Sequence, residues 1–399
     1  MSARPPSGDH FPELDGVRGV AILLVLLLHH LGGVRLGPLG TPFRAGWMGV
    51  DLFFVLSGLL ITRILLRQRG RPGYFRSFYA RRALRIWPLY TLVLAFALLG
   101  AWRIPGLSYE MPAPQSAAYA LYVQNLVYPG SYGPWPLKVT WSLAIEEQFY
   151  VAWPLLVALL PERWLRRFLW GVVAAMPVVR WAALAAGASP LLVYMHTGCR
   201  LDGLAAGGLL ALALAQPGPG PGRFLSRARW GALLVPAACA LVWSPLMGGD
   251  ALIQRPEAVA GAELLAAGGV YTLLSLGFGG VVAMVVGGGG VPAARALFSG
   301  RALRWLGTRS YGLYLYHGIT IHLDQALLRP WLRDHLGGRM AANAAGLALA
   351  VGGLLALAEL SFRFFEQPLL SLKSRFQPGP AAAESLRAGA GPAYDRAPS

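Results

Sequence analysis

Long apolar stretches recur along this chain at a spacing typical of a helical membrane protein. A helix that crosses the hydrocarbon core of a bilayer needs about 20 apolar residues, because the core is about 30 Å thick and a helix rises about 1.5 Å per residue. That length predicts an all-α, polytopic membrane protein with about ten transmembrane helices. The expected spans are residues 17–31, 47–66, 86–102, 144–160, 168–186, 200–215, 230–247, 262–286, 306–328 and 343–365.

Arginine is concentrated in every second connection between these spans. The connection after the second span holds seven arginines between positions 67 and 85, and further basic groups lie in later alternate connections, at 163–167, 223–229 and 295–304. Because cytoplasmic connections are enriched in Arg and Lys, this alternation predicts an even number of spans with both termini in the cytoplasm. The connection at 329–342, which holds three arginines, departs from the pattern.

Composition excludes the other large classes of protein. Apolar residues make up 55% of the chain and charged residues 13%, whereas about a quarter of a soluble domain is charged. The formal net charge of +17 is spread too thinly over too apolar a chain for a soluble nucleic-acid-binding protein. Disorder requires low hydrophobicity, and two cysteines are too few for a disulfide scaffold. The expected partner is therefore the lipid bilayer and not nucleic acid.

Polar segments flank the apolar part of the chain. Residues 1–14 are expected to form a polar cytoplasmic N-terminus, which contains Asp9 and Glu13 and is unlike a cleavable signal peptide. Residues 15–370 are expected to form one membrane domain, whose longest connection, 103–143, faces the outside. Residues 371–399 are rich in Pro, Ala and Gly, which predicts a disordered cytoplasmic tail, too short to be a second catalytic domain.

Arg18 and His29 place ionisable groups inside the first predicted span. Eleven residues at about 100° each make three turns plus about 20°, so both side chains share one helix face, about 16 Å apart. Charges inside spans are costly and usually functional, which favours a cation near the cytoplasmic end and a titratable imidazole deeper in the membrane. The alternative is an arginine that extends to the interface and a histidine satisfied by a neighbouring helix.

Three arginines precede the third span on its predicted cytoplasmic side. If the segment is helical, Arg81 and Arg85 are stacked at i, i+4 and Arg82 flanks them. Since Arg binds phosphate in a bidentate manner, they can form a phosphate clamp. The alternative is that they only orient the protein in the membrane.

Glu146 and Glu147 lie at the outer start of the fourth span. Adjacent residues on a helix diverge by about 100°, so both acids cannot face one pocket squarely. One can support a histidine such as His29 or bind an acceptor hydroxyl, while the other caps the helix N-terminus.

Other polar residues of the predicted spans are interpreted mainly as packing and pairing groups. Asp51 is expected to be a partnered acid or a helix N-terminal charge. Ser57 is expected to pack helices more often than to act as a nucleophile. Pairing between helices is also expected for Arg200, Asp202, His317 and Glu366. The chain contains no phosphate-binding Gly-rich loop that ends in Lys-Ser or Lys-Thr, and no zinc motif, so no metal ligand is assigned.

Several of these segments resemble one family in the expected order. Leu14–Gly19 followed by His29 is similar to the Arg-x10-His signature of the acyltransferase-3 family of integral-membrane acyltransferases. Other segments that resemble its motifs are Gly49–Gly58, Phe78–Tyr90, Trp141–Tyr150, Arg200–Gly203, Ser310–His317 and Phe362–Pro368.

The resemblance implies an enzyme of the acyltransferase class that transfers groups other than aminoacyl groups. It implies transfer of an acyl group, commonly acetyl, from acyl-CoA to a hydroxyl of a carbohydrate, such as a cell-envelope polysaccharide, or of a secondary metabolite. Acyl-CoA would be a donor substrate, with no permanently bound cofactor, and the protein would be a multi-pass protein of the cell membrane. Many members carry an additional C-terminal extracytoplasmic domain that this sequence lacks, which favours direct transfer within the membrane domain.

The resemblance also implies roles for individual residues. His29 would be the catalytic base, since the ordinary imidazole pKa of about 6.5 suits that role near neutrality. Arg18 would lie in the acyl-donor channel, and Glu146 would orient His29 or the acceptor, with Glu147 second. The clamp of Arg81, Arg82 and Arg85 would hold the nucleotide phosphates of the donor. Two other classes remain compatible with the sequence, a transporter or flippase without acyl transfer and a non-catalytic scaffold.

Overall fold

The computed structural model describes residues 11–31, 41–99, 111–129, 133, 136–216, 219–242, 262–286, 291–336 and 338–377. These residues form helices and connections without a strand, which confirms the all-α class. Six helical stretches within them are long and apolar enough to cross a membrane. They are Pro12–Leu31, Ala45–Gln68, Tyr74–Leu99, Glu162–Ala185, Gly268–Val285 and Arg339–Phe376.

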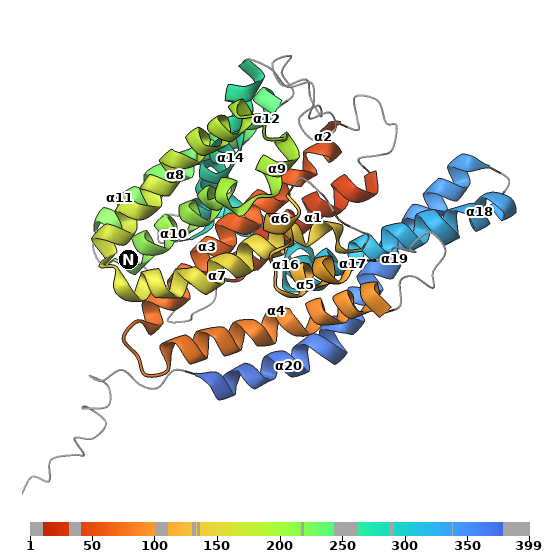
Figure 1. Cartoon of the computed structure of the whole chain (residues 1–399), viewed down its shortest axis with the longest axis horizontal. Helices are drawn as coiled ribbons and strands as arrows, with labels where there is room; N and C mark the ends of the chain where they lie inside the picture. The colour runs from red at the N-terminus through yellow and green to blue at the C-terminus, as the bar shows by residue number, and fades with distance from the viewer. Residues whose placement is uncertain are drawn as a thin grey trace, which may run out of the picture.

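The core of the molecule is a bundle around helix α3 (Met48–Gln68), which α1 (Pro12–Leu31) and α10 (Leu201–Ala215) contact from different sides (Figure 1). Helix α10 lies close against α3 because glycines meet backbone at the contact. A Cβ atom on Gly58 would lie 2.0 Å from the carbonyl oxygen of Leu204, and one on Gly207 would lie 2.0 Å from that of Val55. Small residues permit this close approach. The predicted sixth span is a 15-residue helix that its neighbours enclose.

Two ion pairs are buried within this bundle. Arg200 donates to Asp51 at 2.8 Å, and Arg180 lies 2.9 Å from Asp202, with all four side chains at most 2% exposed. The guanidinium of Arg200 also lies over the ring of Tyr271, 4.0 Å from its centroid. These contacts join α3 and α10 to α8 (Glu162–Ala185) and α14 (Ala262–Val285), which confirms the predicted pairing of Asp51, Arg200 and Asp202.

The predicted ninth span, 306–328, is not one helix. The structure has α16 (Arg301–Thr308), then a break at Arg309, then α17 (Ser310–Leu323) and a π-helical turn, η8 (Asp324–Leu328). Arg309 ends α16 and forms an ion pair with Glu359 of α19 (Arg339–Ser361). Helix α18 (Arg329–Leu336) follows, and Arg329 pairs with Asp324 at 2.5 Å. One of the three arginines that depart from the charge alternation is therefore neutralised within the fold.

The predicted seventh span, 230–247, is also divided. Helix α11 (Pro219–Ala228) leads through the 3₁₀ segment η6 (Arg229–Leu233) into α12 (Leu234–Val242). The rest of this span, the following connection and the Gly-rich run at 287–290 lie outside the described residues, as do residues 1–10 and 378–399.

Helices α4 (Tyr74–Leu99) and α7 (Trp141–Leu159) pack beside α3 and bring the acidic and basic motifs together. Tyrosine hydroxyls of α4 bond to backbone carbonyls of α7, from Tyr79 to Val151 at 2.8 Å and from Tyr74 to Pro154 at 3.1 Å. In the same part of α4, the Ser77 hydroxyl donates to the carbonyl of Phe376 at 2.7 Å.

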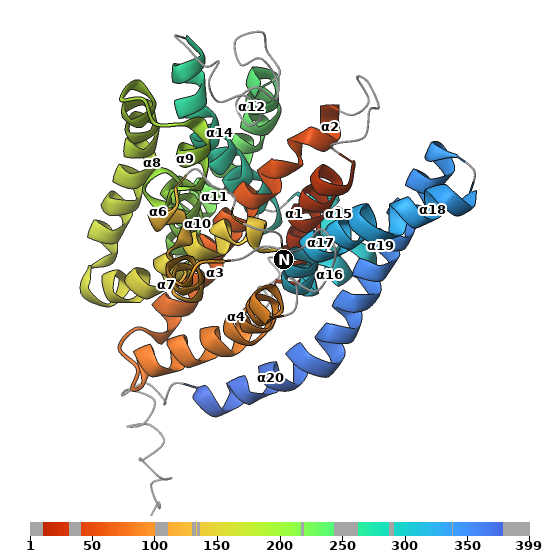
Figure 2. The same ribbon diagram turned by 45° about the vertical axis from the view of Figure 1, so that its right-hand side comes forward.

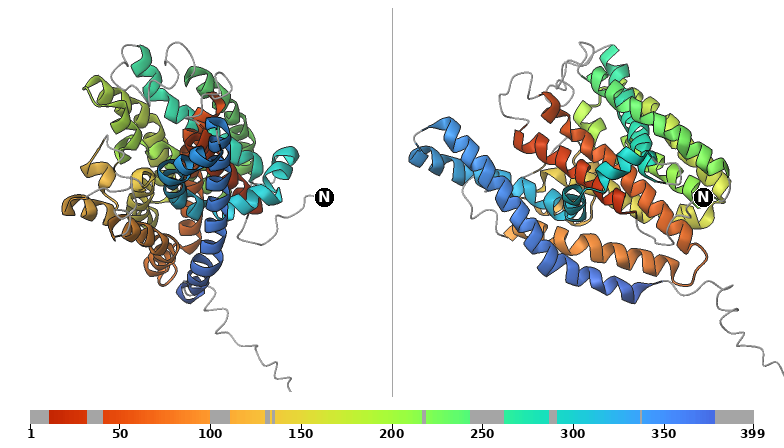
Figure 3. Two further views of the ribbon diagram at one scale, coloured as in Figure 1. Left: turned by 90° about the vertical axis from the view of Figure 1, so that its right-hand side faces the viewer. Right: turned by 180° about the vertical axis from the view of Figure 1, so that it is seen from behind.

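The tenth predicted span continues past its expected end. Helix α19 passes through a π-helical turn, η9 (Phe362–Glu366), into α20 (Gln367–Ser371) and the 3₁₀ segment η10 (Leu372–Phe376). Figures 2 and 3 show that α20 and the segment after it run alongside α4. The first residues of the expected disordered tail are therefore helical and packed.

The connection between α4 and α7 contains short helices, α5 (Ala113–Ala120), α6 (Gln124–Val127) and η4 (Leu137–Val139). Buried amides hold it against the start of α7. Gln124 donates to the carbonyl of Thr140 at 3.1 Å, and Gln148 donates to that of Tyr122 at 2.8 Å. These bonds join the connection to the N-cap of α7 and to Gln148 further along that helix.

Candidate active site

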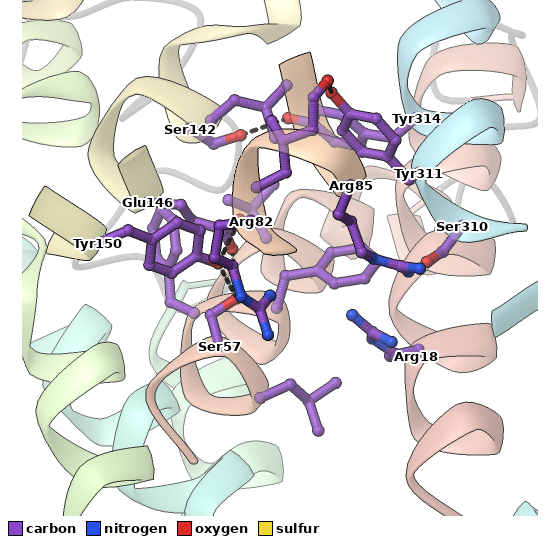
Figure 4. Close-up of a pocket in the computed structure, with 16 residues that line it drawn as sticks. Arg18, Ser57, Arg82, Arg85, Ser142, Glu146, Tyr150, Ser310, Tyr311 and Tyr314 are labelled. Atoms are coloured by element: carbon purple, nitrogen blue, oxygen red, sulfur yellow. Dashed lines mark hydrogen bonds between the residues drawn. The ribbon is translucent and has the colours of Figure 1, made fainter. Parts of the chain in front are cut away.

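A cavity of about 720 Å³, which includes its open mouth, lies between helices α1, α3, α4, α7 and α17 (Figure 4). Its lining comes from five of the segments singled out in the sequence, the last of which, Ser310–His317, begins α17. The lining residues are Arg18, Val50, Phe53, Phe54, Leu56, Ser57, Arg82, Arg85, Ile86, Ser142, Leu143, Glu146, Tyr150, Ser310, Tyr311 and Tyr314.

Three guanidinium groups point into this cavity. Arg18 comes from α1, and Arg82 and Arg85 come from α4, one helical turn apart (Figure 4). Arg18 repels both of the others, and Arg82 repels Arg85. Arg81, predicted as the third member of the clamp, is half-buried on α4 and is not among the residues that line the cavity.

Glu146 lies in the same cavity, within a hydrogen-bonded group. The Ser57 hydroxyl donates to Glu146 Oε1 at 2.6 Å. The Tyr150 hydroxyl lies 3.2 Å from both Ser57 Oγ and Glu146 Oε2. The Arg82 guanidinium lies 5.7 Å from the centroid of the Tyr150 ring. Glu146 is thus a fixed acid beside the arginines.

The expected contact between Glu146 and His29 is not formed. Helices α1 and α3 are antiparallel and touch where Gly49 meets Ala21. Ser57, which holds Glu146, lies eight residues beyond Gly49, and His29 lies eight residues beyond Ala21 in the opposite direction. Because a helix rises about 1.5 Å per residue, the two side chains are separated by on the order of 20 Å. The prediction that Glu146 lies at the depth of His29 in the bundle was therefore wrong.

Glu147 points away from the cavity, as the divergence of adjacent helical residues requires. Its carboxylate accepts a hydrogen bond from the indole of Trp87 in α4 at 3.1 Å. Glu147 therefore helps to hold α4 against α7 and does not line the cavity.

His29 lies in the last turn of α1, with its ring fixed by the backbone. Its Nδ1 is 2.8 Å from the carbonyl oxygen of Val25, and since a carbonyl only accepts, Nδ1 carries the proton. The neutral ring then presents the Nε2 lone pair, which is the tautomer that a base requires. The acid expected at its side is replaced by another imidazole, His317 of α17, whose ring centroid lies 4.8 Å away.

His317 is a feature that sequence reasoning assigned to packing. Its side chain is 0% exposed, its Nδ1 lies 2.7 Å from the carbonyl oxygen of Tyr314, and its Nε2 has no hydrogen-bond partner among the described residues. The sequence feature that could have identified His317 was its place in the Ser310–His317 segment, which resembles a motif of the family. A buried acceptor without a partner costs about 1–3 kcal/mol of folding free energy. The unpaired Nε2 of His317 is therefore unusual for a histidine that only packs between helices.

The lining of the cavity includes Tyr314, one turn of α17 before His317. The Tyr314 hydroxyl lies 2.7 Å from Ser142 Oγ and donates to the carbonyl of Val139 at 2.8 Å. Lys138, in the connection before α7, lies close enough to His29 to act on it electrostatically. Burial lowers the pKa of the Lys138 ammonium below its ordinary value. The arginine end and the histidine end are thus two separate regions along α1.

A family model described as an acyltransferase domain, that of the acyltransferase-3 family, matches residues 11–359. The chain therefore belongs to this family of acyltransferases, and with its apolar helices it is a multi-pass membrane protein.

Curated relatives match over most of this chain. It is 30% identical over 383 residues to the peptidoglycan O-acetyltransferase OatA of Listeria monocytogenes, which is 91% of this chain and 56% of OatA. It is also 30% identical to the protein named "Putative peptidoglycan O-acetyltransferase YrhL" of Bacillus subtilis, over 90% of this chain and 55% of YrhL. The chain thus spans about half the length of these relatives. No solved structure matches it.

Proposed function

We propose that this protein is a membrane-bound O-acyltransferase that moves an acetyl group from acetyl-CoA to a hydroxyl of a glycan. The observation that carries the proposal is the arrangement along α1. Arg18, with Arg82 and Arg85, forms a cationic cavity, and His29 stands eleven residues further on, about 16 Å along the same helix. A donor whose thioester is separated from its phosphates by a long arm fits these two positions.

In this reaction the arginine cavity holds the phosphates of the donor. The acceptor hydroxyl gives its proton to Nε2 of His29 as its oxygen attacks the thioester carbonyl. The carbon–sulfur bond then breaks, the acyl group remains on the acceptor oxygen as an ester, and the CoA thiolate takes the proton back from His29. The hydrogen bond from Nδ1 to Val25 keeps the ring in the tautomer that accepts this proton.

The proposed setting is the plasma membrane, with ten spans and both termini in the cytoplasm. The arginine-rich turn between α3 and α4 supports entry of the donor from the cytoplasmic side, because cytoplasmic connections are enriched in Arg. Two relatives are named for O-acetylation of peptidoglycan, which supports a cell-envelope glycan as acceptor.

Reconstitution in liposomes tests this function against transport without chemistry. Purified protein in liposomes is given acetyl-CoA with a labelled acetyl group and a soluble peptidoglycan fragment as acceptor. We expect label in an ester on the fragment, identified by mass spectrometry and removed by mild alkali. Movement of the fragment or of label across the bilayer without ester formation would show a transporter instead.

Replacing Arg82 should weaken use of the donor more than use of the acceptor. Arg82→Ala removes a cation that lines the cavity, and a hydrogen bond to a charged group contributes about 1.5–3 kcal/mol. We expect the KM for acetyl-CoA to rise by about tenfold or more, with the acceptor KM within about twofold. Arg67→Ala is the matched control, because Arg67 is exposed at the end of α3 and lies outside the cavity lining. Equal effects of the two variants would assign these arginines to membrane orientation only.

A further inference from the structure

Lys373 is one of two lysines in the chain. It lies close enough to Arg18, Arg81, Arg82 and Arg85 to interact with them electrostatically, although it comes from the opposite end of the sequence. It is half-buried on η10, the short segment that packs against α4. The contact is held by the Ser77 hydroxyl of α4, which donates to the carbonyl of Phe376 at 2.7 Å. The position of Lys373 is therefore set by the fold and is not that of a free surface side chain.

The charges around Lys373 are predominantly of its own sign. Its ammonium is repelled by Arg85, Arg82, Arg81 and Arg18, in decreasing order. Acidic side chains compensate only in part, since Glu146 and Glu147 act on Arg82 and Glu366 acts on Arg85. Five cations thus act on one another in a partly buried region, namely Arg18, Arg81, Arg82, Arg85 and Lys373.

Mutual repulsion between these cations is unfavourable unless an anion compensates it. Like charges close together in a region of reduced dielectric raise the free energy of the folded state, and they do so less when an anion lies between them. A basic residue at a membrane protein's cytoplasmic end can act as a topology signal, but that role does not require partial burial beside four arginines. A ligand that carries several phosphate charges would remove the repulsion.

We propose that Lys373, which lies outside the lining of the cavity, is an additional phosphate-binding residue beside it, so that segment η10 extends the donor site formed by α1 and α4. The inference rests on the proposed function, because it takes the phosphates of CoA as the anion. It adds a residue outside the motifs that resemble the family and outside residues 11–359, the part of the chain that the family model matches. Lys373 supplies a compact point charge, which complements the planar guanidinium groups.

Binding of CoA to the purified full-length protein in detergent, measured by titration calorimetry, tests the proposal. Lys373→Met keeps the length of the side chain and removes its charge, and we expect the dissociation constant of CoA to rise by about tenfold. Lys373→Arg should stay within about threefold of the wild-type value, because it keeps the charge. Arg375→Met is the matched control, since Arg375 is exposed on the same segment, and it should leave binding unchanged.

Two further measurements separate phosphate binding from a structural role. Pantetheine, which has no phosphate, should bind wild type and Lys373→Met equally. The Tm of ligand-free Lys373→Met should equal or exceed that of wild type, because one of five like charges is removed, whereas loss of a structural contact would lower it. Weakening of pantetheine binding or a lower Tm would overturn the proposal.

Failure of this proposal differs from failure of the proposed function. If wild type binds CoA and Arg82→Met weakens binding while Lys373→Met does not, Lys373 is not a phosphate ligand and the donor site stands without it. If wild type does not bind CoA at all, the proposed function fails, and the role of Lys373 fails with it.

Discussion

His29→Ala is expected to abolish acyl transfer while leaving the protein folded and inserted. The imidazole lies in the last turn of α1, where its bond to the Val25 carbonyl fixes the tautomer and leaves a lone pair available to take a proton. A positioned general base contributes about 10²–10⁴-fold to rate, so kcat should fall by at least about two orders of magnitude. Label from acetyl-CoA appearing in ester on the glycan measures this directly.

The controls for this variant use neighbouring groups. His30 follows His29 but points about 100° away on the helix, so His30→Ala should retain most of the activity. Binding of CoA to His29→Ala should match wild type, since the arginine cavity lies about 16 Å away along α1. Wild-type rates in His29→Ala would remove the histidine from the mechanism, and lost CoA binding would show that the substitution disturbs the fold.

The sequence predicted the helical class because the apolar pattern is local, but it misjudged elements whose ends depend on partners far along the chain. Arg309 interrupts the predicted ninth span, and its charge is compensated by Glu359, fifty residues away. Helix α10 is too short for a typical span, and its glycines fit against α3 instead of meeting lipid. Contacts of this kind are set by tertiary packing, which a hydropathy window does not contain.

The candidate site was likewise predictable only where it depends on local sequence and not on tertiary packing. Spacing on one helix predicted the relative positions of Arg18 and His29. The arginine motif identified Arg82 and Arg85, which line the cavity with Arg18. The depth of Glu146 depends on how α7 sets against α3, and that register is fixed by contacts between helices, such as the bond from Trp153 Nε1 to Thr62 at 2.8 Å. The contact of His317 with His29 depends on the break before α17, which the sequence did not reveal.

Breaking the buried ion pair between Asp51 and Arg200 should produce the largest loss of stability. Both side chains are at most 2% exposed, and Arg200 donates to Asp51 at 2.8 Å. Asp51→Leu leaves an uncompensated guanidinium inside the bundle, which costs about 3–5 kcal/mol, and Arg200→Met leaves an uncompensated carboxylate. Each single variant should therefore unfold at a Tm well below that of wild type in detergent, measured by thermal denaturation.

The double variant decides whether charge or packing causes that loss. With both charges removed, neither partner is left unpaired. The double variant, Asp51→Leu with Arg200→Met, should therefore be more stable than at least one single variant. Its loss of stability should be well below the sum of the two single losses. The part that remains would reflect the loss of the contact between Arg200 and the Tyr271 ring, which lies 4.0 Å from the guanidinium. Exposed Arg363, which pairs with Glu359 on the surface, serves as the control, because Arg363→Met should change stability by no more than about 1 kcal/mol. Additive losses in the double variant would mean that each side chain stabilises the bundle by its own packing and that the ion pair contributes little.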